Sequence, residues 1–347
     1  MTLGATPPCD YNHPMLPNPH AILDALRELQ RRIRDAVLQS RAAVDLHAVS
    51  HQTSADTIYK LDLLIEPVIE SFCDEWARTT PLVLVAEGIE PETGRLFPAG
   101  INEADATIRI ILDPIDGTRG LMYDKRAAWS LAGAAPNKGP QTRLSDIEVA
   151  VMTELPTSKM ACSDVLYAIK GQGAHGQREP LHTQHSGLST QDLPLSPSRA
   201  TTLAHGFASI SNFFPGTKVL ASQLMEHLAL KLLGPANVNT ASLFDDQYIS
   251  TGGQFYELIV GHDRFNADLR PRFYALQQQP QGLCCHPYDC ATLLVAQEAG
   301  VIITDGFGNP LDGPLDVTTG LAWIGYANES LRRTIEPLVL KFLDPRS

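Results

Sequence analysis

The sequence lacks several patterns that would place it in a common class of protein. No apolar run approaches the ~20 residues that a helix needs to cross a bilayer. The six cysteines contain no CxxC pair, which argues against a zinc site and against a framework of structural disulfides. The eleven histidines contain no HExxH pattern. These absences leave a globular chain whose chemistry must come from other side chains.

Basic residues are scarce relative to acidic ones. The chain has 27 Lys and Arg against 39 Asp and Glu, a net charge of −12, which argues against a nucleic-acid polymer or an anionic membrane as partner. A phosphorylated substrate is compatible with this charge, because bound metal ions reverse the local field of an acidic pocket. Residues 1–19 form a Pro-rich lead without the basic and apolar regions of a secretory signal, so we expect a cytoplasmic protein.

The central feature of the sequence is a short β-branched run, Ile110-Ile111-Leu112, that leads directly into Asp113 and Asp116. The run is too short for a helix and predicts a buried strand. Pro114, which has no N–H for a ladder, is expected to end it. Both carboxylates would then lie at the carboxyl end of a strand, where open α/β sheets bind their ligands.

The backbone around the two carboxylates adds to this site. Together with the Ile115 carbonyl, Asp113 and Asp116 form an oxygen-rich group that suits a hard cation such as Mg²⁺. Gly117 and Thr118 supply N–H groups at a predicted helix start, where phosphate binds. A turn with solvated acidic side chains is the alternative for this stretch.

The first part of the chain alternates helix and strand patterns. Apolar residues at intervals of three and four predict a long amphipathic helix over 20–50. A second helix has Asp62 in its first turn, where an acid also serves as a cap, and the strand 82–86 ends at Glu87. The string 171–176 satisfies GxGxxG, but no helix pattern follows it, so we exclude a dinucleotide-binding fold.

A boundary between two halves is predicted at residues 183–200, which are rich in Ser, Thr and Pro. We therefore expect an N-terminal α+β half over 20–190 and a C-terminal α/β half over 191–347. A strand over 201–206 opens the second half, and a helix follows it. The stretch 254–282 is interpreted as a solvated loop, a cap over the site or an oligomer contact.

The last motif is His286-Pro287-Tyr288-Asp289-Cys290-Ala291. It is predicted to open a helix that ends at the C-cap glycine Gly300, and a strand over 301–305 follows. Asp289 would lie at the helix N-terminus, where a carboxylate acts as an N-cap. His286 is interpreted as shaping the turn, with metal ligation as the alternative.

The string DPIDGT, residues 113–118, resembles the metal-binding motif of the inositol monophosphatase family, within the superfamily of lithium-sensitive phosphatases and fructose-bisphosphatases. Three other blocks follow the order that they have in that family. They are Ala55-Asp56 with Asp62, Glu87-Gly88, and the block from Tyr288-Asp289 to Thr304-Asp305. The resemblance implies a layered α/β/α/β/α sandwich.

The resemblance also implies a Mg²⁺-dependent phosphomonoesterase that acts on a small phosphorylated substrate, and a homodimer. The implied ligands of two or three Mg²⁺ ions are Glu87, Asp113, Asp116, Asp289 and the Ile115 carbonyl. The implied catalytic residues are Thr118, which orients the attacking water, Asp62, which polarises Thr118, and Glu87, which accepts a hydrogen bond from the water. The implied phosphate- or substrate-binding residues are Asp116, Gly117, Thr118 and Arg119.

Two positions depart from the family pattern. Tyr59 replaces the usual Thr, and Gly88 replaces a second Glu. These departures favour an alternative of another class, a non-catalytic protein that binds metal and phosphate. Arg119-Gly120-Leu121 resembles the Lys-Gly-Phe of the 3′,5′-bisphosphate nucleotidases, and a sugar phosphate or bisphosphate is a further alternative to an inositol monophosphate.

Overall fold

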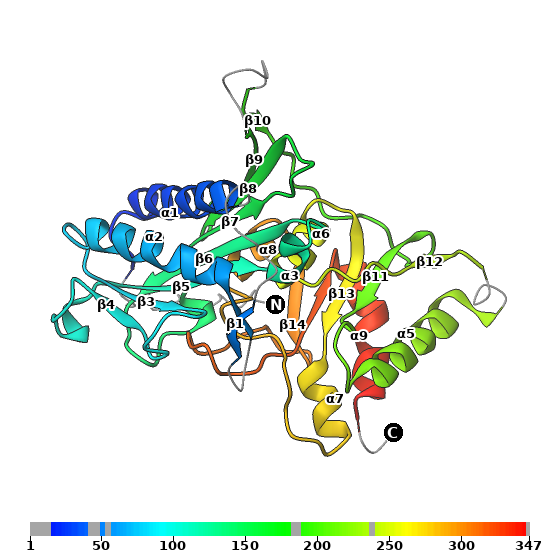
Figure 1. Cartoon of the computed structure of the whole chain (residues 1–347). Helices are drawn as coiled ribbons and strands as arrows, with labels where there is room; N and C mark the ends of the chain where they lie inside the picture. The colour runs from blue at the N-terminus through cyan, green and yellow to red at the C-terminus, as the bar shows by residue number, and fades with distance from the viewer. Residues whose placement is uncertain (1–14, 41–48, 53–56, 182–188, 236–239, 345–347) are drawn as a thin grey trace, which may run out of the picture.

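Two large β-sheets, separated and covered by helices, make up the structure (Figure 1). The computed structural model describes residues 15–40, 49–52, 57–181, 189–235 and 240–344. The strands are β1 (Val49–Gln52), β2 (Thr57–Tyr59), β3 (Leu82–Ala86), β4 (Arg95–Phe97), β5 (Ile108–Asp116), β6 (Ala128–Pro136), β7 (Val149–Leu155), β8 (Cys162–Ile169), β9 (Ala174–Pro180), β10 (Gln191–Asp192), β11 (Gly206–Ile210), β12 (Leu243–Phe244), β13 (Asp263–Asp268), β14 (Ile302–Asp305) and β15 (Trp323–Tyr326). The helices are α1 (Pro19–Ser40), α2 (Lys60–Trp76), α3 (Thr118–Met122), α5 (Lys218–Leu233), α6 (Thr251–Ile259), α7 (Arg270–Leu276), α8 (Leu293–Glu298) and α9 (Glu329–Phe342).

The larger sheet has eight strands in the order β10-β9-β8-β7-β6-β5-β3-β4, and β3 and β5 run parallel. Both faces of its centre are buried. In β6, Trp129 and Leu131 pack into one hydrophobic core, whereas Ala128 and Ala132 pack into another. The period of two along the strand therefore divides its side chains between two cores, one on each face.

Helices α1 and α2 cover one face of this sheet (Figure 1). The apolar stripe of α1 packs against the larger sheet, since Leu26 and Ile33 are fully buried in the same hydrophobic core as the sheet residues beneath them. The helix predicted over 20–50 is confirmed as far as Ser40, and residues 41–48 lie outside the described part of the chain.

The smaller sheet has five strands in the order β12-β11-β13-β15-β14, in which β11 runs parallel to β12 and β13. Helices α6 and α8 contact both sheets and form the layer between them, whereas α5 and α9 cover the outer face of the smaller sheet (Figure 1). The layers therefore follow the order helices, sheet, helices, sheet, helices. This confirms the predicted α/β/α/β/α sandwich, while the division into halves near residue 190 stays a prediction.

Pro114 does not end its strand, contrary to the sequence prediction. Strand β5 continues through Pro114 to Asp116, and its register with β6 shifts between Asp113 and Asp116. Asp113 pairs with Leu131 and Asp116 with Trp129, so β5 carries one extra residue between them, which is a β-bulge. A bulge leaves a residue unpaired, and there a strand tolerates the missing N–H of proline.

The strand predicted over 201–206 is wrong in position, because β11 covers Gly206–Ile210. The carbonyls of Thr202 and Ala204 accept hydrogen bonds from the Arg264 guanidinium instead of from a strand partner. The helix predicted after the strand is confirmed as α5.

Two other stretches acquire regular structure. The stretch 254–282 contains most of α6, all of β13 and α7, so its interpretation as a solvated loop is wrong.

After the turn at Gly171 and Gly173 the chain enters strand β9. No helix follows the GxGxxG string, which confirms the exclusion of a dinucleotide-binding turn.

Candidate functional site

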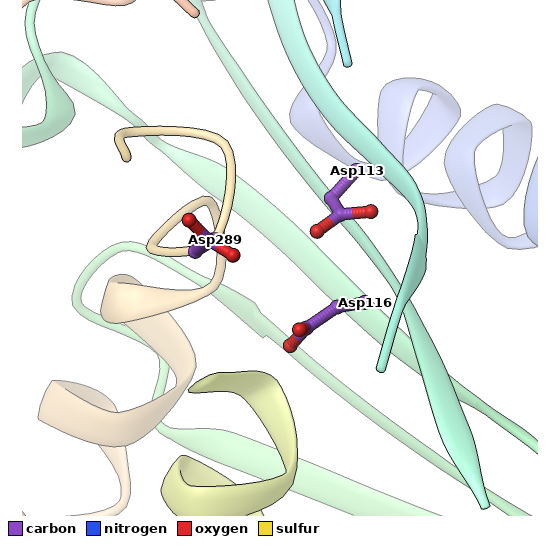
Figure 2. A group of neighbouring side chains, drawn as sticks. All are labelled: Asp113, Asp116 and Asp289. Carbon is purple, nitrogen blue, oxygen red and sulfur yellow. The ribbon is translucent and has the colours of Figure 1, made fainter. Parts of the chain in front are cut away.

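Three aspartates from distant parts of the chain lie together. Asp113 and Asp116 belong to β5, and Asp289 belongs to the turns that precede α8 (Figure 2). One carboxylate oxygen from each lies within 4.8 Å of the others. Asp113 is 1% exposed and Asp116 is 6% exposed. The carboxylates of Asp113 and Asp116 point toward the loop that carries Asp289, so the structure brings together three residues that the sequence analysis had selected (Figure 2).

The β-bulge in β5 directs Asp113 and Asp116 to the same side of the sheet. Side chains three positions apart on a regular strand point to opposite faces. The extra residue resets this alternation, so the two aspartates stand opposite Leu131 and Trp129, which both belong to the core that contains the middle helices. Both carboxylates therefore face the layer of α6 and α8.

The first turn of α6 holds Asp116. Its Oδ2 accepts a hydrogen bond from the Ser250 hydroxyl at 2.8 Å and another from the Gly252 N–H at 2.6 Å. The N–H of Thr251 also bonds to this carboxylate and, with the other two donors, opposes the rise of its pKa. Asp116 thus joins the larger sheet to the start of a helix in the C-terminal part of the chain.

A series of turns holds Asp289. Its Oδ2 accepts a hydrogen bond from the His286 N–H at 2.6 Å. Residues 287–292 form turns, and α8 begins only at Leu293, so the prediction that Asp289 lies at the helix N-terminus is wrong. The Leu293 N–H donates to the Cys290 carbonyl at 2.9 Å, a short-range bond that keeps these turns tighter than an α-helix.

Glu87 reaches the same cluster from a neighbouring strand. It follows β3, whose Ala86 pairs in parallel with Leu112 of β5, and its N–H donates to the Leu112 carbonyl at 3.1 Å. A hydrogen bond between the side chains of Glu87 and Asp113 lowers the pKa of Asp113. The side chain of Glu87 therefore lies close enough to Asp113 to join the same group of oxygen ligands.

Burial is the largest cause of the raised pKa values in the cluster. It raises the pKa of Asp113, and the charges of Asp116 and Asp289 raise it further. Burial also raises the pKa of Asp289, with Asp116 as the next cause. Ionised carboxylates that are this close together and buried away from water repel one another unless a cation neutralises them. An all-oxygen donor set of this kind fits a hard divalent cation such as Mg²⁺.

The segment after Asp116 lies beside this cluster. The Thr118 hydroxyl donates to the Ile115 carbonyl at 2.7 Å, and the Ile115 N–H donates to Asp113 Oδ1 at 3.0 Å. Gly117 has a φ of 95°, and an added Cβ would lie 3.1 Å from backbone of the C-terminal part of the chain, so only glycine fits. Arg119 is exposed.

The structure gives less information on Asp62 and Asp56. Asp62 lies in the first turn of α2, as predicted, but its side chain is outside the described part of the structure. Asp56 lies outside the described residues altogether. The role of Asp62 in polarising Thr118 stays a prediction.

Sequence reasoning missed Ser250, although a signal for it was present. A serine directly before an apolar helical stripe is typical of an N-cap, and Ser250 does cap α6 by accepting the Gly253 N–H at 2.8 Å. Its second contact, with Asp116, joins residues far apart in the sequence, and no local pattern predicts such a contact.

Comparison with solved structures identifies the fold. The chain is similar to fructose-1,6-bisphosphatase of Leishmania major, with a TM-score of 0.67 and 14% identity over 95% of this chain and 96% of that one. The chain has the inositol monophosphatase fold. It is also similar to the extragenic suppressor protein suhB of Bartonella henselae, with a TM-score of 0.60 and 16% identity over 92% of this chain and 99% of that one. For the IMPase of Thermotoga maritima the TM-score is 0.58, with 15% identity over 93% and 97% of the two chains.

These likenesses establish the inositol monophosphatase fold and nothing finer, because the identities are low. No protein-family model matches the sequence, and no curated protein matches it. Within the ranges that the structure describes, no helix combines the length and the apolar character needed to span a membrane.

Proposed function

We propose that this protein is a Mg²⁺-dependent phosphomonoesterase that hydrolyses a small phosphorylated metabolite such as an inositol monophosphate. The observation that carries the proposal is the group of Asp113, Asp116 and Asp289, in which one carboxylate oxygen from each residue lies within 4.8 Å of the others. The fold supports it, since similar solved structures are named IMPase and fructose-1,6-bisphosphatase.

The metal ligands in this proposal are the three aspartates, with Glu87 and the Ile115 carbonyl beside them. Bound Mg²⁺ would neutralise the phosphoryl oxygens and lower the pKa of a water molecule. The chain itself supplies carboxylates that are already close together. Its hydrogen bonds to Asp116 and Asp289 orient these groups before any ion binds, as expected for metal ligands.

The proposal gives Thr118 the task of orienting the attacking water. Its hydroxyl donates a hydrogen bond to the Ile115 carbonyl, so the hydroxyl oxygen can accept a hydrogen bond from the water. Glu87 accepts a second hydrogen bond from that water, and Asp62 polarises Thr118. The phosphate binds against Asp116, the N–H groups of Gly117 and Thr118, and Arg119.

Arg119 favours a second class of substrate. Its side chain is exposed and directly follows Thr118, where a cation would meet a second phosphate group. The alternative activities are therefore a 3′,5′-bisphosphate nucleotidase and a sugar phosphatase or bisphosphatase that uses the same cluster.

Phosphate release from a panel of substrates tests the proposal. The panel contains an inositol monophosphate, a nucleoside 3′,5′-bisphosphate and fructose 1,6-bisphosphate, each with Mg²⁺ and each with EDTA. We expect Mg²⁺-dependent release from at least one of them. We expect Asp113→Asn to reduce turnover at least about 100-fold, because loss of a ligand costs more than loss of a group that supports one.

Asp105→Asn is the matched control, since it makes the same chemical change at an exposed position. Circular dichroism should show that both variants fold. Full turnover by a folded Asp113→Asn protein would contradict the assignment of the site.

Gly88 favours the alternative of another class, a non-catalytic protein that binds metal and phosphate. It stands where the resembling family has a second Glu, and its φ of 72° lies in the left-handed region that favours glycine, although an added Cβ would meet nothing within 4 Å. Tight binding of inorganic phosphate with Mg²⁺, without release from any substrate on the panel, would favour this alternative.

The proposal includes a homodimer, as the sequence resemblance implies, and a location in the cytoplasm. Light scattering of the purified protein measures the oligomeric state, and a monomer at micromolar concentration would remove this part of the proposal. The phosphatase assignment does not depend on it, because the described metal-ligand candidates all come from one chain.

A further inference from the structure

We propose that Ser250 is a positioning residue that fixes the Asp116 carboxylate for metal binding. The inference rests on the proposed function, because it concerns the same cluster of carboxylates. Nothing in the sequence resemblance assigns a role to Ser250, and its contacts in the structure are the reason to assign one.

The Ser250 hydroxyl both donates and accepts a hydrogen bond. It donates to Asp116 Oδ2 at 2.8 Å and accepts from the Gly253 N–H at 2.8 Å. The side chain is buried, with the residue 4% exposed. A hydroxyl whose oxygen already accepts one hydrogen bond has its proton directed away from that donor, here toward Asp116. The helix cap therefore also orients the donor that holds the carboxylate.

The turn that presents Ser250 packs closely against Tyr248, which is bonded to the larger sheet. A Cβ added at Gly253 would collide with the ring of Tyr248, so the backbone packs directly on that ring. The Tyr248 hydroxyl donates to the Ala127 carbonyl at 2.9 Å and accepts from Trp129 Nε1 at 2.9 Å. The position of Ser250 is thereby tied to the strand that pairs with the aspartate end of β5.

Three donors at the start of α6 hold the Asp116 carboxylate. Oδ2 receives the Ser250 hydroxyl and the Gly252 N–H, and the Thr251 N–H also bonds to the carboxylate, so the start of α6 fixes the orientation that Asp116 presents to a cation. The same turn reaches the segment that carries Asp289, since the Thr251 hydroxyl lies 3.8 Å from the sulfur of Cys285. Hydrogen bonds that orient a metal ligand are worth about 10- to 100-fold in metal affinity.

The test compares Ser250→Ala and Ser250→Gly with the unmodified protein. Both variants lose the hydroxyl, but glycine is nearly as good an N-cap as serine, so Ser250→Gly separates the contact with Asp116 from the capping of α6. Mn²⁺ binding is measured by electron paramagnetic resonance without substrate. The Mg²⁺ concentration for half-maximal phosphate release and the kcat at saturating Mg²⁺ are measured separately.

We expect both variants to bind Mn²⁺ about 10-fold more weakly and to need about 10-fold more Mg²⁺, with kcat at saturating Mg²⁺ within about twofold of the unmodified protein. Ser211→Ala is the control, because Ser211 is fully buried and bonds to the Gln254 side chain instead of to a carboxylate. It should leave Mn²⁺ binding unchanged. Ser250→Thr, which keeps the hydroxyl, should restore most of the affinity.

A change in Mn²⁺ affinity of less than about threefold in both Ser250→Ala and Ser250→Gly overturns the inference. An equal loss in Ser211→Ala also overturns it, because the effect would then follow from any lost buried hydroxyl. Mn²⁺ binding that depends on Ser250 in a protein that releases no phosphate would keep the inference and reject the phosphatase. Absence of Mn²⁺ binding by the unmodified protein would reject both.

Discussion

Burial raises the pKa of acidic side chains outside the metal cluster as well, and Glu154 is an example. Glu154 lies outside the metal cluster, yet burial raises its pKa to about 7, and the charges of Asp164 and Glu257 act in the same direction. The Asp164 N–H, which donates to Glu154 at 3.1 Å, compensates only in part. A carboxyl group with a raised pKa holds its proton in the folded state at a pH where the unfolded chain has released it.

This difference predicts a loss of stability as pH rises. Below pH 4.5 Glu154 is protonated in both states, and between pH 4.5 and about 7 only the unfolded state releases the proton. The free energy of unfolding should therefore fall over this range by at most about 3 kcal/mol on account of Glu154. Glu154→Gln should remove this part of the pH dependence, as measured by urea unfolding at pH 5 and pH 8.

Glu92→Gln is the control for Glu154→Gln, because Glu92 is exposed and should leave the pH dependence unchanged. Parallel pH profiles for Glu154→Gln and the unmodified protein would show that Glu154 titrates normally.

The sequence predicts individual site residues better than it predicts their supports. Asp113, Asp116 and Asp289 stand out because each belongs to a short motif with strong local signals. Ser250 does not, since its contact with Asp116 spans 134 positions and depends on how α6 packs. The prediction that Pro114 ends its strand is wrong for a similar reason. Only the pairing of β5 with β6 determines whether a proline ends a strand or lies in a bulge.

At the scale of elements, strand β6 packs directly against the turns that carry Asp289. A Cβ added to Gly133 of β6 would lie 2.6 Å from the Ala291 carbonyl and 2.7 Å from Ile147 Cδ1. The missing side chain thus allows the backbone of these turns to lie on the sheet. The position of Asp289 relative to β5 depends on this close approach, since β6 is the neighbour of β5.

Gly133→Ala should therefore push the turns away from the sheet. We expect it to lower the free energy of unfolding by about 1–3 kcal/mol and to raise the Mg²⁺ concentration needed for activity. Urea unfolding and a Mg²⁺ titration measure the two effects. Ala132→Gly, on the opposite face of the same strand, should leave the Mg²⁺ requirement unchanged, and an equal change in both variants would argue against this explanation.

At the scale of the whole molecule, the carboxylate cluster couples folding to metal. An ion that binds only the folded state adds about 2.7 kcal/mol of stability at a concentration 100 times its Kd. For a chain of this length we expect Mg²⁺ at that concentration to raise Tm by about 4 °C. Because the pKa of Asp113 and of Asp289 is raised, protons compete with Mg²⁺, and the rise should be larger at pH 8 than at pH 5.5.

Differential scanning calorimetry measures this shift, with NaCl at equal ionic strength as the control for screening. An identical rise in Tm with NaCl and with MgCl₂ would show that no specific ion binds.

The separation of Asp116 and Asp289 along the chain has a consequence for biosynthesis. A nascent polypeptide on the ribosome can complete the larger sheet long before its final third has emerged, since N-terminal parts fold first. Until the turns near Asp289 leave the exit tunnel, Glu87, Asp113 and Asp116 lack their partner from the C-terminal part of the chain. Translation that stops before Asp289, or proteolysis that removes it, should yield a polypeptide without a complete cation site.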